Sequence, residues 1–311
     1  PFIRGVSAAG EAAIFTWEGN ALGAQSTISL AHYTREGAER IVNLAVDEIR
    51  RLEQIFSLQI SDSELSTLNR DGRLTRPSHD MLVLLTEAKR YSKMSEGAFD
   101  VTVQPLWTLY REHFLSNPDS KDGPSRADID ETLRLVNYRR IEANPLFVRL
   151  DRDGMQLTLN GIAQGYITDK VSDLLRKNGL SNVLVSLGET RALDGHPEGR
   201  PWLVALADPM NSDFTAHNIN LTNMAVATSG GYGTEFDRTG RYHHLFDPRV
   251  GESAWNHVGV SVIAPRATTA DALSTALYVL PPDDAENLVR RAGAVTAILT
   301  KPDGTEYTLQ A

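Results

Sequence analysis

Residues 166–187 read Tyr-Ile-Thr-Asp-Lys-Val-Ser-Asp-Leu-Leu-Arg-Lys-Asn-Gly-Leu-Ser-Asn-Val-Leu-Val-Ser-Leu. The first part predicts a helix from Tyr166 to Asn178, because Gly179 stands where a helix C-cap favours a left-handed backbone. The apolar run from Asn182 to Leu187 predicts a buried strand. A helix and a buried strand therefore adjoin in this stretch.

Working outward, apolar residues that recur every two positions predict strands, and those that recur every three or four predict helices. Upstream, the expected elements are strands over 12–17 and 27–33 with a turn near residues 19–20, a helix from Glu36, a helix from Ser78 to Ser95, and a hairpin over 147–160 that turns at Asp153-Gly154. Downstream, they are strands over 202–207, 218–227 and 258–264, helices over 269–280 and 283–292, and a terminal hairpin over 295–310.

Strands and helices are mixed in this order without regular alternation, which favours an α+β fold with mainly antiparallel sheets and packed helices. We expect residues 1–311 to form a single domain. The polar stretch 112–127 is either a linker between two subdomains or an excursion within the domain.

Composition excludes several classes of function. Acidic residues number 40 against 31 basic ones, giving a net charge of −9, and no dense Lys/Arg run could follow a nucleic-acid backbone. The chain has no cysteine, which excludes thiolate catalysis, disulfides and metal–thiolate sites. No apolar run approaches the roughly 18 residues needed to span a bilayer. Because the chain begins at Pro1, we expect a processed, exported protein of the periplasm.

Two segments carry oxygen-rich or glycine-rich patterns suited to phosphate chemistry. Within 269–275, Asp271 and Thr275 are four residues apart, so a helix presents both side chains on one face, as Mg²⁺ sites in phosphate-ester enzymes require. The alternative is an ordinary helix start with Asp271 in its first turn. Residues 160–166, Asn-Gly-Ile-Ala-Gln-Gly-Tyr, lead from strand to helix and would let a diphosphate approach the backbone closely. Many such loops bind nothing.

Two further segments suit a flat heterocycle and a proton acceptor. In 95–103, Asp100 follows an aromatic residue and could meet the N–H edge of a ring. The alternative is that this segment is simply a helix C-cap that leads into a strand. A fourth pattern combines 227–232, Ala-Thr-Ser-Gly-Gly-Tyr, with 242–248, Tyr-His-His-Leu-Phe-Asp-Pro. The second of these segments places His243 and His244 just before a turn. One of these histidines could act as a base near neutral pH, or both could lie at a surface strand end.

Taken together, these segments resemble one family, the bacterial FAD:protein FMN transferases or ApbE flavin transferases. The matching runs, in the family's order, are Gly-Ala-Phe-Asp at 97–100 with Thr-Val-Gln-Pro-Leu at 102–106, Leu-Asn-Gly-Ile-Ala-Gln-Gly-Tyr at 159–166, Asn-Val-Leu-Val-Ser-Leu-Gly at 182–188, Ala-Thr-Ser-Gly at 227–230, the turn at 244–251, and Ala-Asp-Ala-Leu-Ser-Thr-Ala-Leu at 270–277. The resemblance covers roughly residues 20 to 300. We expect the branch associated with nitrous oxide reductase maturation.

The resemblance implies an ApbE-like fold with a flavin site in a cleft between subdomains, Mg²⁺ as cofactor and FAD as substrate. The implied magnesium ligands are the Gly161 carbonyl and the Asp271 and Thr275 side chains, with Ser274 as a further candidate. The implied flavin-lining residues are Leu22, Gln59, Ala98, Phe99, Asp100, Thr158, Gln164 and Phe246. His244 matches the family's histidine near the scissile diphosphate. Three departures are Gln164 where the family usually has Lys, Thr158 where an acid is common, and Ala24 where Thr usually follows Gly23.

The implied reaction is Mg²⁺-dependent transfer of FMN from FAD to a serine or threonine hydroxyl, with AMP leaving. The hydroxyl needs a base, for which His244 and Asp271 are the candidates. Family acceptors are membrane-associated redox proteins with a short Ser/Thr motif. Two alternatives remain: an FAD pyrophosphatase that transfers to water, and a flavin-binding or carrier protein without catalysis.

Overall fold

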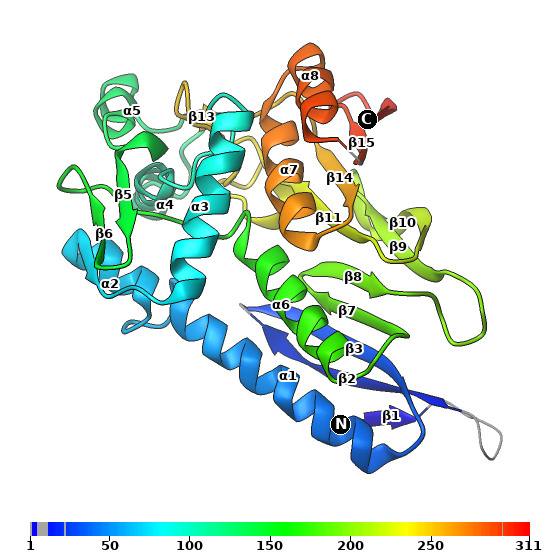
Figure 1. Ribbon diagram of the computed structural model, residues 1–311. Helices are drawn as coiled ribbons and strands as arrows, with labels where there is room; N and C mark the ends of the chain where they lie inside the picture. Colours follow the sequence, from blue (N-terminus) through cyan, green and yellow to red (C-terminus); the bar gives the residue numbers. More distant parts are fainter. Residues whose placement is uncertain (1, 5–11, 22, 294) are drawn as a thin grey trace.

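A computed structural model describes residues 2–4, 12–21, 23–293 and 295–311 (Figure 1). The helices are α1 (Arg35–Phe56), α2 (Glu64–Asp71), α3 (His79–Met94), α4 (Gln104–Ser116), α5 (Arg126–Leu133), α6 (Ala163–Lys177), α7 (Ala267–Val279) and α8 (Pro282–Ala292), with short 3-10 turns at Tyr138–Arg140 and Gly231–Gly233. The strands are β1 (Phe2–Arg4), β2 (Ala13–Ala21), β3 (Ala24–His32), β4 (Arg73–Thr75), β5 (Ile141–Asn144), β6 (Phe147–Leu150), β7 (Val183–Leu187), β8 (Glu189–Leu193), β9 (Trp202–Asp208), β10 (Asn211–Leu221), β11 (Ala225–Gly230), β12 (Phe246–Asp247), β13 (Glu252–Ser253), β14 (Gly259–Ala264), β15 (Thr296–Thr300) and β16 (Glu306–Gln310).

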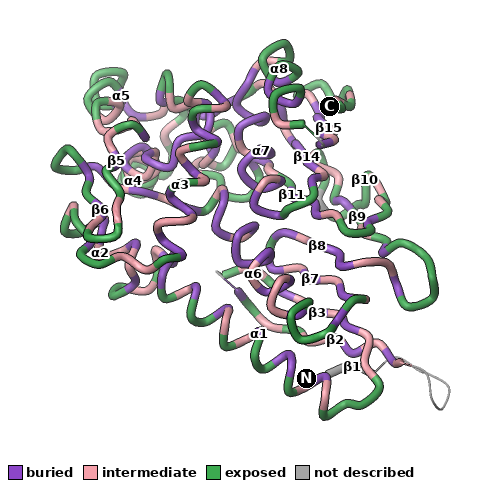
Figure 2. The backbone as a smooth tube through the Cα atoms, viewed as in Figure 1, coloured by how far each residue is buried: buried purple, intermediate pink, exposed green. Residues whose placement is uncertain are grey.

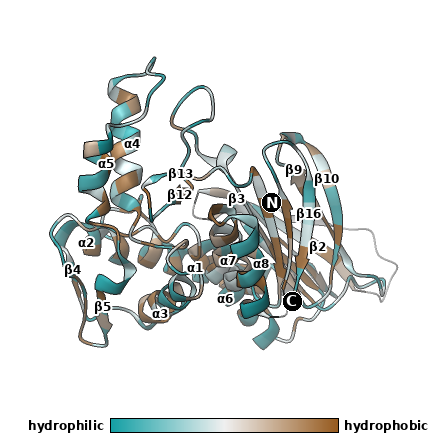
Figure 3. Cartoon of the chain, turned by 90° about the horizontal axis from the view of Figure 1, so that it is seen from above, coloured by the Kyte–Doolittle hydropathy of each residue, from teal (hydrophilic) through white to brown (hydrophobic). Residues whose placement is uncertain are grey.

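One large antiparallel sheet organises the described part of the chain. Its nine strands run in the order β1-β2-β3-β7-β8-β11-β14-β15-β16, and a separate small sheet has the order β4-β6-β5. Helices α1, α6 and α7 cover one face of the large sheet, and the β9–β10 hairpin lies on the other (Figure 3). The predicted α+β class with mainly antiparallel sheets is therefore confirmed.

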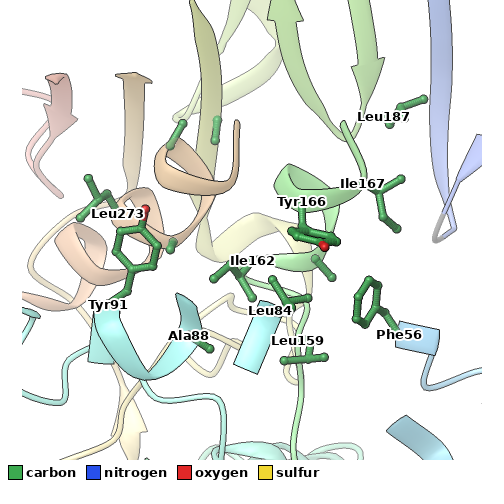
Figure 4. Close-up of a cluster of buried hydrophobic side chains, with 14 of the residues drawn as sticks. Phe56, Leu84, Ala88, Tyr91, Leu159, Ile162, Tyr166, Ile167, Leu187 and Leu273 are labelled. Atoms are coloured by element: carbon green, nitrogen blue, oxygen red, sulfur yellow. The ribbon is translucent and has the colours of Figure 1, made fainter. Parts of the chain in front are cut away.

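The core lies between the large sheet and this helical layer. α7 and the central strands are buried along most of their length, whereas the turns around α5 and α8 are exposed (Figure 2). Side chains of α1, α3, α6 and α7 meet around Leu159 and Ile162 of the segment that leads into α6 (Figure 4). There the rings of Phe56 and Tyr166 pack edge to face with their centres 5.6 Å apart. This packing fixes the start of α6 against the end of α1.

Two predicted turns are wrong. β2 continues through residues 19–20 and the chain turns between Ala21 and Ala24, where Gly23 has a φ of 80°. Gly19 is instead needed because a Cβ there would overlap the indole ring of Trp17. The hairpin expected over 147–160 does not form, since no strand follows β6 within that described stretch; β6 pairs instead with the preceding β5, with Asn144 opposite Phe147.

Gly154, with a φ of 86°, turns the chain out of β6 rather than into a second strand. The backbone beyond it is held by a side chain: Asn69 donates from its amide to the Leu157 carbonyl at 2.8 Å and accepts from the Leu157 N–H at 2.7 Å.

The single strand expected over 218–227 is also divided, since β10 ends at Leu221 and β11 begins at Ala225. In the stretch 112–127, α4 continues to Ser116 and α5 starts at Arg126.

Among the described residues, no helix is both long and apolar enough to cross a membrane.

Candidate functional site

A cleft of about 960 Å³ lies between α2, α4, β8, β11 and α7. The positions of these five elements can be followed in Figure 1. The predicted site residues that line it are Gln59, Ala98, Phe99, Asp100, Thr158, Gly161, Gln164, His244, Phe246, Asp271 and Thr275. Ser274 lies behind the cleft wall and is buried. Leu22 lies outside the described residues. Segments as far apart in the sequence as Gln59 and Thr275 thus converge on one cavity.

The first turn of α7 is held by a buried ion-pair network centred on Asp169 of α6. The Asp169 carboxylate accepts hydrogen bonds from the backbone N–H groups of the first two α7 residues, both at 3.0 Å. It also accepts from Arg191 at 2.8 Å and Arg266 at 3.1 Å. A carboxylate at a helix N-terminus satisfies otherwise unpaired N–H groups. Asp169 therefore fixes the turn from which Asp271 projects.

Asp271 is buried with 3 % of its surface exposed, and its Oδ2 accepts from the Gly165 N–H at 2.9 Å. Burial, with a contribution from the nearby Asp169 charge, raises the pKa of Asp271 to about 7. Gly165 permits this close approach of α6 and α7, because a Cβ there would lie 2.8 Å from the Asp271 Cβ and overlap the Ala267 carbonyl. The raised pKa indicates that no positively charged side chain among the described residues neutralises the Asp271 carboxylate.

Sequence reasoning missed a second carboxylate in this wall, Glu189 at the start of β8. Glu189 lines the cleft and is 8 % exposed. Burial raises its pKa well above the ordinary range, and the neighbouring Asp271 charge adds to the effect, while the Thr228 N–H opposes it. The sequence offered only a weak signal for Glu189: it is an acidic residue two positions after the predicted buried strand that ends at Leu187.

Hydroxyl groups complete the polar wall beside these acids. Ser229 Oγ lies 2.8 Å from Ser274 Oγ and 3.3 Å from Thr275 Oγ1, and Ser274 donates to the Asp271 carbonyl at 2.9 Å. Gly161 lies against the same hydroxyls, since a Cβ there would be 2.9 Å from Thr275 Oγ1. Ser229 came from a motif noted in the sequence but was not singled out as a site residue.

This donor set fits a magnesium ion. Carboxylate, hydroxyl and backbone carbonyl oxygens are the ligands that Mg²⁺ prefers, and two uncompensated buried carboxylates call for a cation. Asp271, Thr275 and the Gly161 carbonyl would hold it, with Glu189 close by. Ser274 is less suited, because its hydroxyl is engaged with Ser229 and the Asp271 carbonyl. In the described part of the chain, no cluster of three or more His, Cys, Asp or Glu has metal-binding geometry, so a soft-metal site is not indicated there.

Asp100 braces the wall on which a flat ligand would rest. Its carboxylate accepts from the Thr102 N–H at 2.8 Å, the Thr102 hydroxyl at 2.6 Å and the Tyr138 N–H at 2.9 Å. These contacts fix the preceding Ala98 and Phe99, both buried at the cleft surface. Asp100 thus shapes the pocket, whatever further contact it makes with a ligand.

Gln164 lies over the end of β7. A Cβ on Gly188 would approach the Gln164 Nε2 to 2.6 Å, and Gly188 has a φ of 93°, so two constraints favour glycine there. The side chain presents an uncharged amide to the cleft at this position.

The two adjacent histidines differ in chemistry. His243 is buried, donates from Nε2 to the Ala254 carbonyl at 3.0 Å and accepts at Nδ1 from the Leu245 N–H at 3.3 Å. His244 is half-buried, lines the cleft and donates from Nδ1 to the Thr234 carbonyl at 3.2 Å. Its Nε2 has no hydrogen-bond partner among the described residues, and burial lowers the pKa of His244, which keeps the ring neutral. Of these two histidines, only His244 can accept a proton from a ligand in the cleft.

Comparison with known proteins gives consistent matches. A family model described as the ApbE family matches residues 22–299. The FAD:protein FMN transferase of Haemophilus influenzae is 31% identical over 252 residues, covering 78% of this chain and 73% of the relative. That of Treponema pallidum is 31% identical over 287 residues, covering 84% and 78%. The apo crystal structure of the Pseudomonas stutzeri flavinyl transferase ApbE superposes with a TM-score of 0.82 at 27% identity, covering 97% of this chain and 96% of that one.

Proposed function

The chain belongs to the ApbE family, and from that premise we propose that it is an FAD:protein FMN transferase that joins FMN to a serine or threonine hydroxyl and releases AMP. The observation that carries the proposal is the single cleft, in which an aromatic and amide-lined wall meets a wall of carboxylates and hydroxyls. The first wall suits an isoalloxazine ring and the second a metal-bound diphosphate.

The flavin would lie against Phe99, Phe246 and the Ala98 backbone, with the amides of Gln59 and Gln164 at its polar edge. Phe246 is held in place by Tyr110, whose ring centre lies 4.9 Å away. The Phe99 N–H donates to the Ser95 hydroxyl at 3.0 Å, which fixes the backbone at the base of the pocket. A pocket held rigid in this way binds a flat ring without loss of side-chain entropy.

Asp271, Thr275 and the Gly161 carbonyl would hold Mg²⁺. When bound, the ion would neutralise charge on the diphosphate of FAD. The chain supplies the pre-formed oxygens and the water-poor wall around them. A local cation is required because the protein as a whole carries a net charge of −9 and its substrate is an anion.

His244 is the better supported base. The acceptor hydroxyl forms a bond to the FMN phosphorus, the bond from that phosphorus to the bridging oxygen breaks, and AMP leaves with that oxygen. The hydroxyl proton passes to His244 Nε2, which has a free lone pair. Asp271, the other candidate, already uses one oxygen on the Gly165 N–H and fits the metal better.

The deciding experiment incubates the protein with FAD, Mg²⁺ and a membrane-associated redox domain that carries the family's Ser/Thr motif. Intact mass of the acceptor is measured together with free nucleotides. A mass gain equal to FMN less one water, with one AMP per acceptor, supports transfer. FMN and AMP without labelled acceptor would make the protein an FAD pyrophosphatase, and intact FAD would make it a carrier.

A further inference from the structure

Helix α4 presents a polar stripe to the cleft that the flavin and metal residues do not explain. Gln104, Trp107, Thr108 and Arg111 all line the cavity. Their spacing of three, four and seven residues places them on one helix face. The opposite face carries Leu106, Tyr110 and Phe114, which are buried in a separate core cluster that anchors the helix.

Arg111 is the charged member of this stripe, and among the described residues it has no acidic partner. Its guanidinium lies 5.5 Å from the centre of the Trp107 ring, which itself packs edge to face on Phe236 at 5.9 Å. The other arginine of the cleft, Arg70, is paired with the Asp71 carboxylate at 2.9 and 3.0 Å. Arg111 therefore offers its N–H donors to the cavity, while Arg70 is neutralised.

Three carboxyl groups, those of Asp100, Glu189 and Asp271, line the cleft. FAD brings two further negative charges on its diphosphate. A guanidinium recognises phosphate by paired N–H donors, and stacking on an indole holds its plane in a fixed orientation. An oriented arginine without a carboxylate partner is suited to bind such an anion.

Building on the proposed function, we propose that Arg111, oriented by Trp107, binds a phosphate group of FAD and is a substrate-binding residue of this chain. The residue acts on affinity for the diphosphate and not on the flavin ring. Its contribution depends on the charge and on the planar donor pair, so a lysine replaces it only in part.

The test compares binding of FAD and riboflavin by quenching of flavin fluorescence, in wild type, Arg111→Gln and Arg111→Lys. Arg73→Gln is the matched control, because Arg73 also stacks on an aromatic ring, Phe147 at 4.6 Å, but lies outside the cleft. We expect Arg111→Gln to weaken FAD binding about tenfold with riboflavin unchanged, Arg111→Lys to be intermediate, and the control to bind both as wild type does.

Unchanged FAD affinity in Arg111→Gln overturns the inference and leaves the proposed function standing. An equal loss for riboflavin and FAD also overturns it, because the variant would then have disturbed the pocket rather than a phosphate contact. Wild-type protein that bound neither flavin would overturn the proposed function itself, and this inference with it.

Discussion

At the scale of single residues, neighbouring positions in one chain carry different chemistry because their hydrogen-bond partners differ. His243 and His244 follow each other in the sequence, yet only His244 has an imidazole nitrogen free for a ligand. Replacing His244 with alanine should slow FMN transfer by about 10² to 10⁴ while FAD still binds, as expected for a lost general base. Single-turnover transfer and flavin fluorescence measure the two steps separately, and an unaltered transfer rate would move the base elsewhere.

The lowered pKa of His244 also predicts the pH profile. The ring stays neutral below the ordinary histidine pKa of 6.5, so transfer should persist there and fall only as the pH drops through the lower value. Initial rates between pH 5 and 8 give the midpoint. A midpoint above 6.5 would contradict the environment described for His244.

The burial of His243 leads us to expect that the free energy of unfolding depends on pH. Burial lowers the pKa of His243 to about 4, whereas the unfolded chain binds this proton near 6.5. Between these values the unfolded state carries more protons, so the free energy of unfolding should decrease by about 2 kcal/mol from pH 7 to pH 5. Urea titrations at both pH values measure it. His243→Gln cannot titrate and should show a smaller decrease; equal decreases would exclude this histidine as the cause.

Individual residues also mark the limit of sequence reasoning at the site. The common location of Asp271 and Thr275 was predictable, because helical spacing alone places them on one face, and both line the cleft. Glu189 was not, since its importance comes from lying beside Asp271, and a single sequence does not reveal contacts between distant strands and helices. For Asp100, the sequence predicted a ligand contact but could not show that three protein hydrogen bonds already engage the carboxylate.

At the scale of elements, the approach of α6 to α7 creates the acidic wall. Gly165→Ala would place a methyl group against the Ala267 carbonyl, where backbone rather than a flexible side chain must move. We expect a loss of about 1–3 kcal/mol in stability, and a larger loss of activity because Asp271 shifts. Urea unfolding and transfer kinetics test this. Wild-type stability and activity together would show that the two helices are not in close contact.

The Asp169 network makes a second prediction about α7. Asp169→Ala leaves Arg191 with a weaker partner and removes the acceptor for the first N–H groups of the helix. Because the Asp169–Arg191 ion pair is buried, the free energy of unfolding should fall by about 3 kcal/mol in this variant. Asp173→Ala is the control, since that half-buried acid touches the same arginine at 3.0 Å and should cost under about 1 kcal/mol. Similar losses in both variants would contradict a central role for Asp169.

The order of most elements was predictable because apolar periodicity is a local property. The helices α1, α3, α6, α7 and α8 and the terminal hairpin lie close to their expected places. The turns were wrong where a residue serves a contact that is distant in the sequence or not visible in it. Gly19 makes room for the Trp17 ring, and the backbone after Gly154 pairs with the Asn69 side chain rather than with a strand.

At the scale of the whole molecule, the cleft is assembled from elements that are remote in sequence, and motif order could predict their convergence only through resemblance to a family. The α+β class, the family and its transferase character are supported by the comparisons. Periplasmic location, the branch of the family and the single-domain organisation stay predictions. The roles of the individual cleft residues also stay predictions, because they depend on ligand contacts that no single segment of the sequence contains.

A ligand that contacts elements from distant parts of the sequence should raise the free energy of unfolding of the whole molecule. The proposed magnesium ion allows the most direct test of this expectation. At ten times its dissociation constant, Mg²⁺ should add about 1.4 kcal/mol to the free energy of unfolding and raise Tm by about 2 to 4 °C. In Asp271→Ala this Mg²⁺-dependent rise should disappear while the metal-free protein keeps its fold, because the variant removes a buried carboxylate that has no cation partner. The control Asp283→Ala, exposed on α8, should respond as wild type does. Thermal melts with EDTA and with Mg²⁺ measure this without any need for turnover; a Mg²⁺ response that survives in Asp271→Ala would place the ion elsewhere.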